Sequence, residues 1–350
     1  MWTYRPGLEE LPVYTVEESD WAVKLDANES PFNLPPRVAE RVEDRLACLA
    51  FNRYPDLGKM GLREMLAESY GLAVEEVQVG GGSSEILAAI CHALGGPGRG
   101  IVYPTPSFSM YGIYAKITDS VAVPVALNEQ YQLDAAKVLQ AARENNAAVI
   151  LLCNPNNPTG SVTPREEIER IIAGAPCPVV ADEAYMEFYG DSVVDLLPKY
   201  RHLIVARTFS KAYGLAAARV GYMLADAQVT TMISKLMMPY HVSAISLVVA
   251  ETVWQMRDEF QPLIDTLVLE RKRLATELGK IQDLTVYPSE TNFIFGRSAK
   301  TQEMVAYLME KRICIRNFGG ELSDCFRISV GSSMENDALL REMRAFWERS

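Results

Sequence analysis

Residues 147–182 read AAVILLCNPNNPTGSVTPREEIERIIAGAPCPVVAD, and this stretch decides the fold. Two apolar runs, Ala148–Cys153 and Pro178–Ala181, are typical of buried strands. The charged and amphipathic Pro164–Ala173 between them predicts a helix. A strand, a helix and a second strand in this order predict one unit of a parallel sheet covered by helices.

The same alternation extends outward over residues 60–225. Further strands are predicted at Val77–Val79, Gly100–Tyr103, Val121–Val125, Leu203–Ala206 and Arg219–Leu224, and further helices at Ser84–Leu94, Phe108–Ile117 and Asp134–Asn145. The helix of the central unit has a marked start, with Thr163 as N-cap, Pro164 at the first helical position and Glu166 in a capping box. The pattern predicts an α/β fold with a mainly parallel central sheet flanked by helices.

After Ala225 the sequence changes to longer amphipathic stretches, which predict a smaller α+β domain. LIDTLVLERKRLATELGKI is expected to form a connecting helix. Strands are predicted around Thr285–Tyr287, Thr291–Phe295, Cys314–Arg316 and Cys325–Val330, with a closing helix at Asn336–Trp347. We therefore expect an N-terminal arm at residues 1–30, a large domain at 31–240 and a small C-terminal domain at 241–350.

Composition narrows the class of protein. The net charge of −11 and the pI near 5.0 argue against nucleic acid or an anionic membrane as partner. The longest apolar runs are far shorter than the roughly 20 residues that span a bilayer, and MWTYRPGLEE lacks the order of a signal peptide, so we expect a cytoplasmic protein. Six cysteines occur without a CxxC pair, which argues against a metal site and favours reduced thiols.

A lysine follows the strand predicted at 203–206. The segment RTFSKAYGLAAARVGY, Arg207–Tyr222, carries Lys211 among small hydroxyl residues, with Arg219 eight residues later. Burial and a neighbouring cation favour loss of the lysine proton, which is needed for Schiff-base chemistry. A lysine in a loop is more often a solvated surface charge, so Lys211 gains weight only from its neighbours.

Asp182 lies in ADEAYMEF at the carboxyl end of a predicted buried strand, where open α/β sheets bind ligands. A buried carboxylate needs a cation, and a protonated pyridine nitrogen would serve. The alternative is that Asp182 caps the next helix.

Two polar turns follow other predicted strands. CNPNNPTG, Cys153–Gly160, offers Asn156 and Asn157 as amide donors, although it could be a plain loop. GGGSSEILAAI, beginning at Gly80, is a glycine-rich turn followed directly by a predicted helix. The free backbone amides at the start of that helix would form a cradle for an anion. The glycine spacing differs from that of dinucleotide and nucleoside triphosphate sites.

In order and spacing, GGGSSE, NPNNPTG, ADEAY and TFSKAYGLAAARVGY resemble the fold-type I aminotransferases that use pyridoxal 5′-phosphate (PLP). LDANESPF, NRYPD, SETNFIF and FRISVG narrow the resemblance to the histidinol-phosphate aminotransferases, class II in that group. The resemblance covers nearly the whole chain. It implies a large PLP-binding domain, a smaller domain and a homodimer with shared active sites.

The resemblance also implies roles for residues around the cofactor. Lys211 would form the Schiff base and move protons, and Asp182 would pair with the ring nitrogen. Asn157 and Tyr185 would hold the phenolic oxygen, while Phe108 would stack on the ring, in place of a tyrosine that is common in relatives. The phosphate site would comprise Gly82, Ser83, Ser84, Thr208, Ser210 and Arg219, with Tyr54 from the neighbouring subunit.

For the substrate, the resemblance implies that Arg316 and Arg327 bind the distal anion, because the guanidinium fork suits both a phosphate and a carboxylate. Tyr14 would complete that pocket, and Asn28 would border it. Arg327 alternates with Phe326 and Ile328, so it could also be an outward-facing strand residue. The alanine run in GLAAARVGY and the short arm before Leu25 depart from many relatives and leave substrate preference open.

The reaction implied is transamination between L-histidinol phosphate and 2-oxoglutarate, with glutamate as the reverse donor. The alternatives are a threonine-phosphate decarboxylase and an aromatic or broad-specificity aminotransferase. A PLP-sensing regulatory module is a reading of another class. Only about 25 residues precede the first motif, too few for a helix-turn-helix domain.

Overall fold

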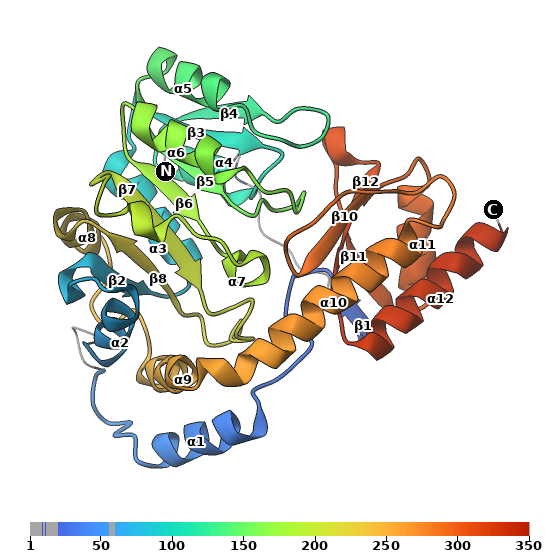
Figure 1. The fold of residues 1–350 in the computed structure, drawn as a ribbon, viewed down its shortest axis with the longest axis horizontal. Helices are drawn as coiled ribbons and strands as arrows, with labels where there is room; N and C mark the ends of the chain where they lie inside the picture. Colours follow the sequence, from blue (N-terminus) through green and yellow to red (C-terminus); the bar gives the residue numbers. More distant parts are fainter. Residues whose placement is uncertain (1–8, 10, 12–19, 56–59, 350) are drawn as a thin grey trace, which may run out of the picture.

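The computed structural model describes residues 9, 11, 20–55 and 60–349. A seven-stranded sheet organises the larger of its two bodies, in the order β2-β8-β7-β6-β5-β3-β4 (Figure 1). Its strands are β2 (Val77–Gly80), β3 (Gly100–Thr105), β4 (Val121–Ala126), β5 (Ala147–Cys153), β6 (Val179–Asp182), β7 (Leu203–Thr208) and β8 (Gly221–Ala225). The neighbours from β7 to β4 are parallel, and β8 is antiparallel to β2 and β7. The predicted fold class, a mainly parallel sheet in an α/β protein, is confirmed.

Helices cover both faces of this sheet, because successive strand side chains point to opposite sides. In β6, Val179 and Ala181 pack into one core and Val180 into the other. The core that holds Val180 is covered by α3 (Ser83–Leu94), α4 (Met110–Ile117) and α8 (Ala227–Ser234). The opposite core is covered by α2 (Met60–Tyr70), α5 (Ala135–Glu144), α6 (Arg165–Gly174), α7 (Met186–Tyr189) and α9 (Ala244–Gln255). Helix α1 (Pro36–Ala47) packs beside α9.

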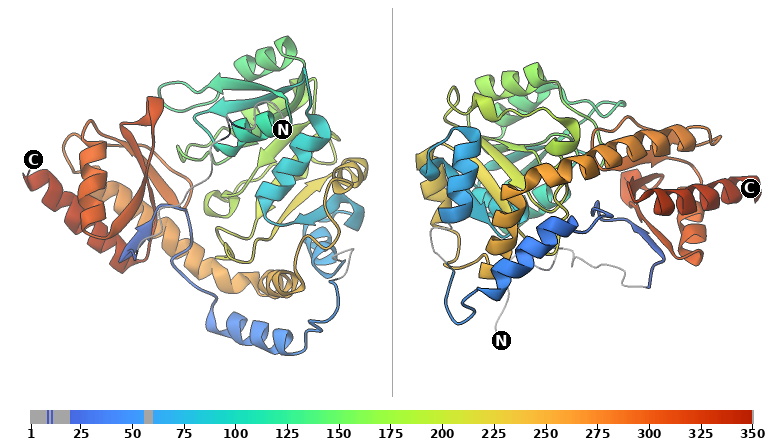
Figure 2. Two further views of the ribbon diagram at one scale, coloured as in Figure 1. Left: turned by 180° about the vertical axis from the view of Figure 1, so that it is seen from behind. Right: turned by 60° about the horizontal axis from the view of Figure 1, so that its bottom comes forward.

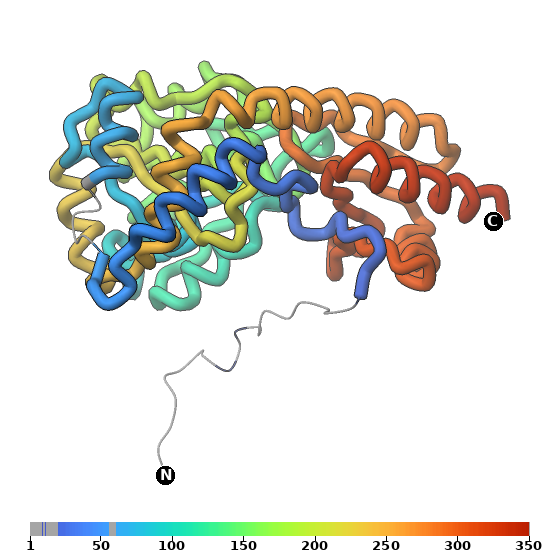
Figure 3. Tube along the Cα trace, turned by 90° about the horizontal axis from the view of Figure 1, so that it is seen from below, coloured from blue at the N-terminus to red at the C-terminus, as the bar shows by residue number. Residues whose placement is uncertain are grey.

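The smaller body contains a five-stranded sheet in the order β1-β11-β12-β10-β9. Its elements are β1 (Val23–Leu25), β9 (Thr285–Val286), β10 (Phe293–Arg297), α11 (Thr301–Glu310), β11 (Ile313–Asn317), β12 (Cys325–Ser329) and α12 (Ser333–Arg349). Helix α10 (Gln261–Leu278) runs from the larger body to the smaller one (Figures 2 and 3). Its residue Leu267 is buried in the larger core and Leu274 in the smaller core.

The domain limits at residues 30 and 240 stay a prediction, to which the packing adds two observations. Strand β1 pairs in parallel with β11, so residues 23–25 lie in the smaller sheet. Helix α9 buries Leu247 and Val253 in the larger core. On these contacts we propose that the change from one body to the other occurs along α10.

The predicted capping box at α6 is wrong. Pro164 is the N-cap, with φ −54° and ψ 142°, and α6 begins at Arg165. The backbone N–H of Thr163 donates instead to Asn154 Oδ1 at 2.8 Å, and the first helical bond runs from the Glu167 N–H to the Pro164 carbonyl oxygen at 3.0 Å. The turn after β5 therefore fixes Thr163 before the helix starts.

Within the described ranges, no helix is both long enough and apolar enough to cross a membrane.

Candidate active site

Three neighbouring parallel strands end at one edge of the larger sheet, and the predicted motifs follow them. Asp182 is the last residue of β6, and Asn157 lies in the turn after β5. Lys211 follows β7, which ends at Thr208. The carboxyl ends of these strands therefore bring together residues that are up to 54 positions apart in the sequence.

Lys211 is partly buried and directed at the chain segment that follows β1. Its Nζ donates a hydrogen bond to the carbonyl oxygen of Ala27 at 3.0 Å. Burial, together with the positive charge of Arg327, lowers the pKa of Lys211 to about 8. The amine is therefore neutral in a much larger fraction of molecules near pH 7 than a surface lysine would be.

Asp182 is 3% exposed, and burial raises its pKa to about 6. Its Oδ2 accepts a hydrogen bond from the Tyr111 hydroxyl at 2.8 Å, and its Oδ1 accepts from the Ala184 N–H at 3.3 Å. Among the described residues, no cation pairs with it. Helix α7 starts with Tyr185 as N-cap and without a side-chain cap, so Asp182 does not cap that helix.

Tyr111 is a residue that the sequence reasoning missed. It is fully buried, and burial raises its pKa well above the usual value, with the Asp182 charge adding to that rise. The Phe108 ring lies edge-on to it, with centroids 5.6 Å apart. Its spacing of three residues from Phe108 could have revealed Tyr111 in the sequence, because this spacing places both rings on one side of the chain at the start of α4.

The Tyr185 oxygen accepts two hydrogen bonds from amide groups. Asn28 Nδ2 donates at 3.0 Å and Asn157 Nδ2 at 3.2 Å. Burial raises the pKa of Tyr185 far above neutrality, so the hydroxyl keeps its proton. Tyr185 and Asn157 are thus adjacent, as the resemblance implied, and Asn28 joins them from the segment after β1.

The glycine-rich turn forms a cradle at the start of α3. Gly82 is the N-cap, with φ 84° and no side-chain cap bond. A Cβ at this position would lie 2.6 Å from Arg219 Nη2, so only glycine lets the guanidinium approach the turn. Arg219 Nη1 donates to Ser210 Oγ at 3.3 Å, and Thr208 Oγ1 accepts from the Ser210 N–H at 3.1 Å.

The cradle combines the helix amides of Ser83 and Ser84 with a cation and two hydroxyl groups, which is a chemical environment suited to a phosphate. The predicted phosphate-site residues of this subunit therefore lie together.

Arg327 and Arg316 stand opposite each other on β12 and β11. Residues paired across antiparallel strands point to the same face, so two guanidinium groups share this face. Arg327 is 9% exposed and donates from Nη1 to Asn157 Oδ1 at 2.7 Å and from Nη2 to the Asp26 carbonyl oxygen at 2.6 Å. It therefore faces the larger body rather than solvent, whereas Arg316 is exposed.

Of the two remaining predicted site residues, the structure describes only Tyr54. Tyr54 is 79% exposed and its ring stacks on Tyr240, with centroids 4.4 Å apart. Tyr14 lies outside the described residues.

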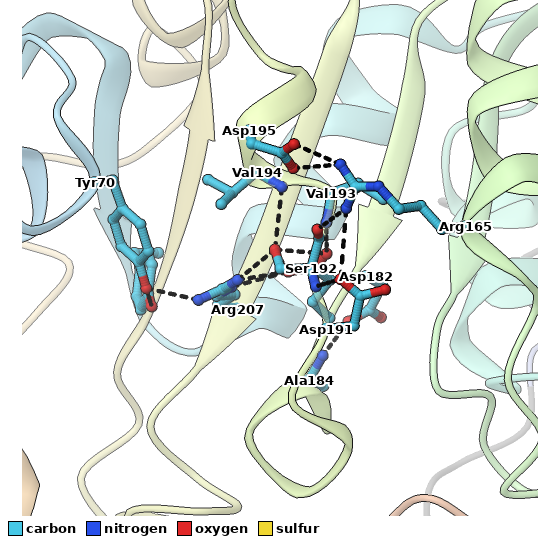
Figure 4. A network of polar contacts seen from close by, with 12 residues as sticks. Tyr70, Arg165, Asp182, Ala184, Asp191, Ser192, Val193, Val194, Asp195 and Arg207 are labelled. Carbon is cyan, nitrogen blue, oxygen red and sulfur yellow. Dashed lines mark hydrogen bonds and ion pairs between the residues drawn. The ribbon is translucent and has the colours of Figure 1, made fainter.

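A second polar cluster supports the edge of the sheet behind Asp182 (Figure 4). The Arg207 and Glu183 side chains, each 3% exposed, form an ion pair of 2.7 Å. Ser192 Oγ donates to Glu183 Oε2 at 2.7 Å, and Arg207 Nη1 donates to the Tyr70 hydroxyl at 2.6 Å. The sequence reasoning passed over Glu183 and Arg207, although both lie inside the quoted motifs next to Asp182 and Thr208.

The two bodies touch at Gly160 and Ser289. Gly160 ends the NPNNPTG turn with φ 75°, and any Cβ there would collide with the Ser289 side chain and lie 3.0 Å from Ser289 Cα. The Glu290 N–H donates to the Gly160 carbonyl oxygen at 2.9 Å. The turn that carries Asn157 is therefore in direct backbone contact with the loop before β10.

These residues fit PLP on three separate observations. The cradle suits a phosphate, the buried carboxylate of Asp182 has no cationic partner among the described residues, and the Lys211 amine has a lowered pKa. Each group meets one chemical feature of the cofactor: the phosphate, the pyridine nitrogen and the aldehyde carbon.

Comparison with known proteins gives the family. The profile of the family described as aminotransferase class I and II matches residues 22–343. The chain belongs to the class I and II aminotransferases. Within this family, a histidinol-phosphate aminotransferase of a Thermoanaerobacter species is 39% identical over 333 residues, which cover 95% of each chain. The predicted resemblance to the histidinol-phosphate aminotransferases is confirmed.

Solved aminotransferase structures have the same fold. The histidinol-phosphate aminotransferase of Sinorhizobium meliloti, in complex with pyridoxal 5′-phosphate, superposes with a TM-score of 0.90 at 26% identity and covers 98% of both chains. The L-threonine-O-3-phosphate decarboxylase of Porphyromonas gingivalis gives 0.82 at 24% identity, over 93% of this chain and 99% of that one. This second likeness concerns the fold alone.

Proposed function

We propose that this aminotransferase holds PLP on Lys211 and transfers an amino group between L-histidinol phosphate and 2-oxoglutarate, as a step of histidine biosynthesis. The observation that carries the proposal is the arginine pair on the smaller sheet, which faces the partly buried Lys211 of the larger body. Two adjacent like charges are unfavourable without an anion between them. A substrate with a distal phosphate or carboxylate supplies that anion.

The protein residues divide the chemical work. PLP, when bound, supplies an electron sink for the pair released at the substrate Cα. The negative charge of Asp182 would keep the ring nitrogen protonated, while Tyr111 holds the Asp182 carboxylate through its Oδ2. The neutral Lys211 amine would take the proton from the substrate Cα and deliver it to the cofactor carbon that carried the aldehyde. Arg327 and Arg316 fix the distal anion and so orient the Cα–H bond.

The same arginine pair allows two substrates to use one site. A guanidinium donates two parallel hydrogen bonds to a phosphate or to a carboxylate with similar geometry. Histidinol phosphate and glutamate would thus bind in turn, which gives ping-pong kinetics. The choice of histidinol phosphate is supported by the relatives at 35–39% identity that carry this name.

We further propose that the protein acts as a homodimer. Large apolar side chains are exposed on two segments, which meet where Tyr54 stacks on Tyr240. These side chains are Phe51, Tyr54, Met232, Leu236, Met238, Tyr240 and Ile245. The cradle is close by, since a Cβ at Gly81 would lie 4.0 Å from the His241 carbonyl oxygen. A second copy covering this surface would bring its own Tyr54 towards the cradle. The net charge of −11 disfavours binding to nucleic acid. Together with the small-molecule chemistry, this favours a soluble cytoplasmic enzyme.

A half-reaction assay tests the substrate. Histidinol phosphate added to the PLP-loaded protein, without 2-oxoglutarate, should convert the visible absorbance of the bound cofactor in a stoichiometric amount. Release of carbon dioxide from threonine phosphate would instead identify a decarboxylase. Faster conversion by phenylalanine than by histidinol phosphate would identify an aromatic aminotransferase. Size-exclusion chromatography with light scattering tests the dimer, and a monomer at micromolar concentration would contradict it.

A further inference from the structure

Asn28 occupies an unusual place between the two bodies. It lies three residues after β1 of the smaller sheet, on the segment that leads to α1. It is 1% exposed and has a left-handed backbone, with φ 54°. Asparagine tolerates this conformation better than most residues, although glycine is the residue without a penalty. A buried asparagine in this conformation is explained if its side chain makes hydrogen bonds that glycine could not make.

All four hydrogen-bonding groups of Asn28 are used. Its backbone N–H donates to Ser329 Oγ at 2.8 Å, and its Oδ1 accepts from the same hydroxyl at 3.3 Å. Its carbonyl oxygen accepts from Asn292 Nδ2 at 3.0 Å. Its Nδ2 donates to the Tyr185 oxygen at 3.0 Å. Three of these bonds hold Asn28 to the smaller body, and the fourth reaches the larger one.

The identity of each donor follows from the neighbours. Arg327 can only donate, so the Asn157 atom that it contacts is the oxygen, and the Asn157 amide nitrogen faces Tyr185. The Ser329 oxygen receives the Asn28 N–H, so its own proton points to Asn28 Oδ1, which leaves the Asn28 amide nitrogen for Tyr185. Both bonds to Tyr185 therefore have the tyrosine oxygen as acceptor.

We infer that Asn28 is a positioning residue that aims the Tyr185 proton at the phenolic oxygen of PLP. A phenol oxygen with two N–H donors on its lone pairs keeps its proton for a third direction. Asn157 alone fills one acceptor position, and with Asn28 absent the tyrosine proton is free to rotate. Ser329 lies two residues from Arg327 on β12, so Asn28 also links the strand that binds the substrate anion to this tyrosine.

The inference deepens the proposed function, since it takes bound PLP for granted. Its test needs no amino donor, so it is independent of which substrate the enzyme uses. The pH midpoint of the visible absorbance of bound PLP reports the proton shared between the Lys211-linked nitrogen and the phenolic oxygen. A hydrogen bond donated to that oxygen stabilises its negative charge and lowers the midpoint.

Asn28→Gly keeps the left-handed backbone and removes the side chain. We expect the midpoint to rise by about half a pH unit or more, because a hydrogen bond to a charged oxygen is weakened. Asn28→Asp has nearly the same shape but only accepts, so it should draw the tyrosine proton to itself and give a larger rise. Ser329→Ala loosens the Asn28 side chain and should give part of the shift. Asn33→Gly, an exposed asparagine on the same segment, should give none.

Tyr185→Phe supplies the decisive background. If Asn28 acts through Tyr185, adding Asn28→Gly to Tyr185→Phe leaves the midpoint where Tyr185→Phe alone puts it. Additive shifts, or an unchanged midpoint in both Asn28 variants, would overturn the inference. The dissociation constant of PLP from each variant, measured by titration of cofactor-free protein, should change in the same order. A variant that fails to fold is replaced in the cycle by Asn28→Asp or Ser329→Ala.

Discussion

The larger and the smaller sheet hold their site residues in different ways. On the larger sheet, Asp182 is held by Tyr111 of the same body, and Glu183 beside it is held by Arg207. On the smaller sheet, Arg327 is held by Asn157 and by the Asp26 carbonyl oxygen, which lie outside its own hairpin of strands. Arg316 opposite is exposed.

The larger sheet thus carries a preorganised site, whereas on the smaller sheet the hydrogen-bond partners of Arg327 can be exchanged for a substrate. Removing one partner of a buried ion pair such as Arg207–Glu183 costs about 3–5 kcal/mol, so this cluster should stay paired in the folded protein. A carbonyl oxygen bonded to a guanidinium can be exchanged for a carboxylate or phosphate, which binds it more strongly. The larger sheet therefore suits a resident cofactor, and the smaller sheet suits substrates that come and go.

The sharpest test of the larger sheet is Lys211→Ala. Turnover should fall by about 10⁴-fold or more, because the base and the attachment point are lost together. The visible absorbance of bound PLP should shift, and borohydride should no longer fix the cofactor to the protein. Lys137→Ala, an exposed lysine on α5, is the matched control. Retained turnover in the Lys211 variant would refute its role.

Substitution of the arginine pair tests the smaller sheet. Arg327→Ala should lower kcat/KM by about 10²–10³-fold for donors with a distal anion, since a bidentate charged contact is lost. Arg316→Ala should lower it less, because Arg316 is the exposed member of the pair. Donors without a distal anion should be affected little by either change. Equal losses for both kinds of donor would show that the pair has a structural role only.

The sequence predicted the larger sheet better than the smaller body. Apolar runs and glycine-rich turns located the seven strands of this sheet to within about three residues, because its central strands are buried on both faces and bounded by polar turns. Lys211, Asp182, Asn157 and the cradle could be located since strand ends of a parallel sheet lie together. The roles of these residues stay predictions. The start of α6 was wrong because Asn154, nine residues before Thr163, binds its backbone.

Contacts between distant segments could not be predicted. Tyr111 reaches Asp182 across 71 positions, and Asn28 reaches Ser329 across 301. Such contacts depend on how distant segments pack within each body, which local patterns do not encode. The pairing of β1 with β11, which places residues 23–25 in the smaller sheet, escaped detection for the same reason.

The rate of cofactor capture should depend on pH through Lys211. Only the neutral amine attacks the aldehyde, and the pKa of Lys211 is lowered to about 8. As pH rises from 6 to 8 the protonated fraction falls, so the rate should increase by roughly 10-fold per pH unit and level off above 8. Stopped-flow mixing of PLP with cofactor-free protein measures this. A rate that still rises about 10-fold per pH unit above pH 9, as for an ordinary lysine, would contradict the lowered pKa.

Tyr111→Phe should have the smallest effect. Loss of one hydrogen bond to the Asp182 carboxylate should raise the pKa of Asp182 further and weaken PLP binding by roughly 3–10-fold. The ring remains, so the core and its contact with Phe108 should be kept. Tyr103→Phe removes a hydroxyl from the neighbouring ring and is the control. Unchanged PLP affinity would mean that Asp182 does not need the hydrogen bond from Tyr111.

Gly160 sets a limit on how this enzyme can evolve. The turn that carries Asn157 and the loop before β10 approach each other so closely that a hydrogen atom is the largest side chain that fits. A methyl group at that point would collide with Ser289 and keep the sheet that carries Arg316 and Arg327 away from Lys211. Substitutions around the anion pocket can therefore change the substrate range, but the spacing of the two sheets must stay the same.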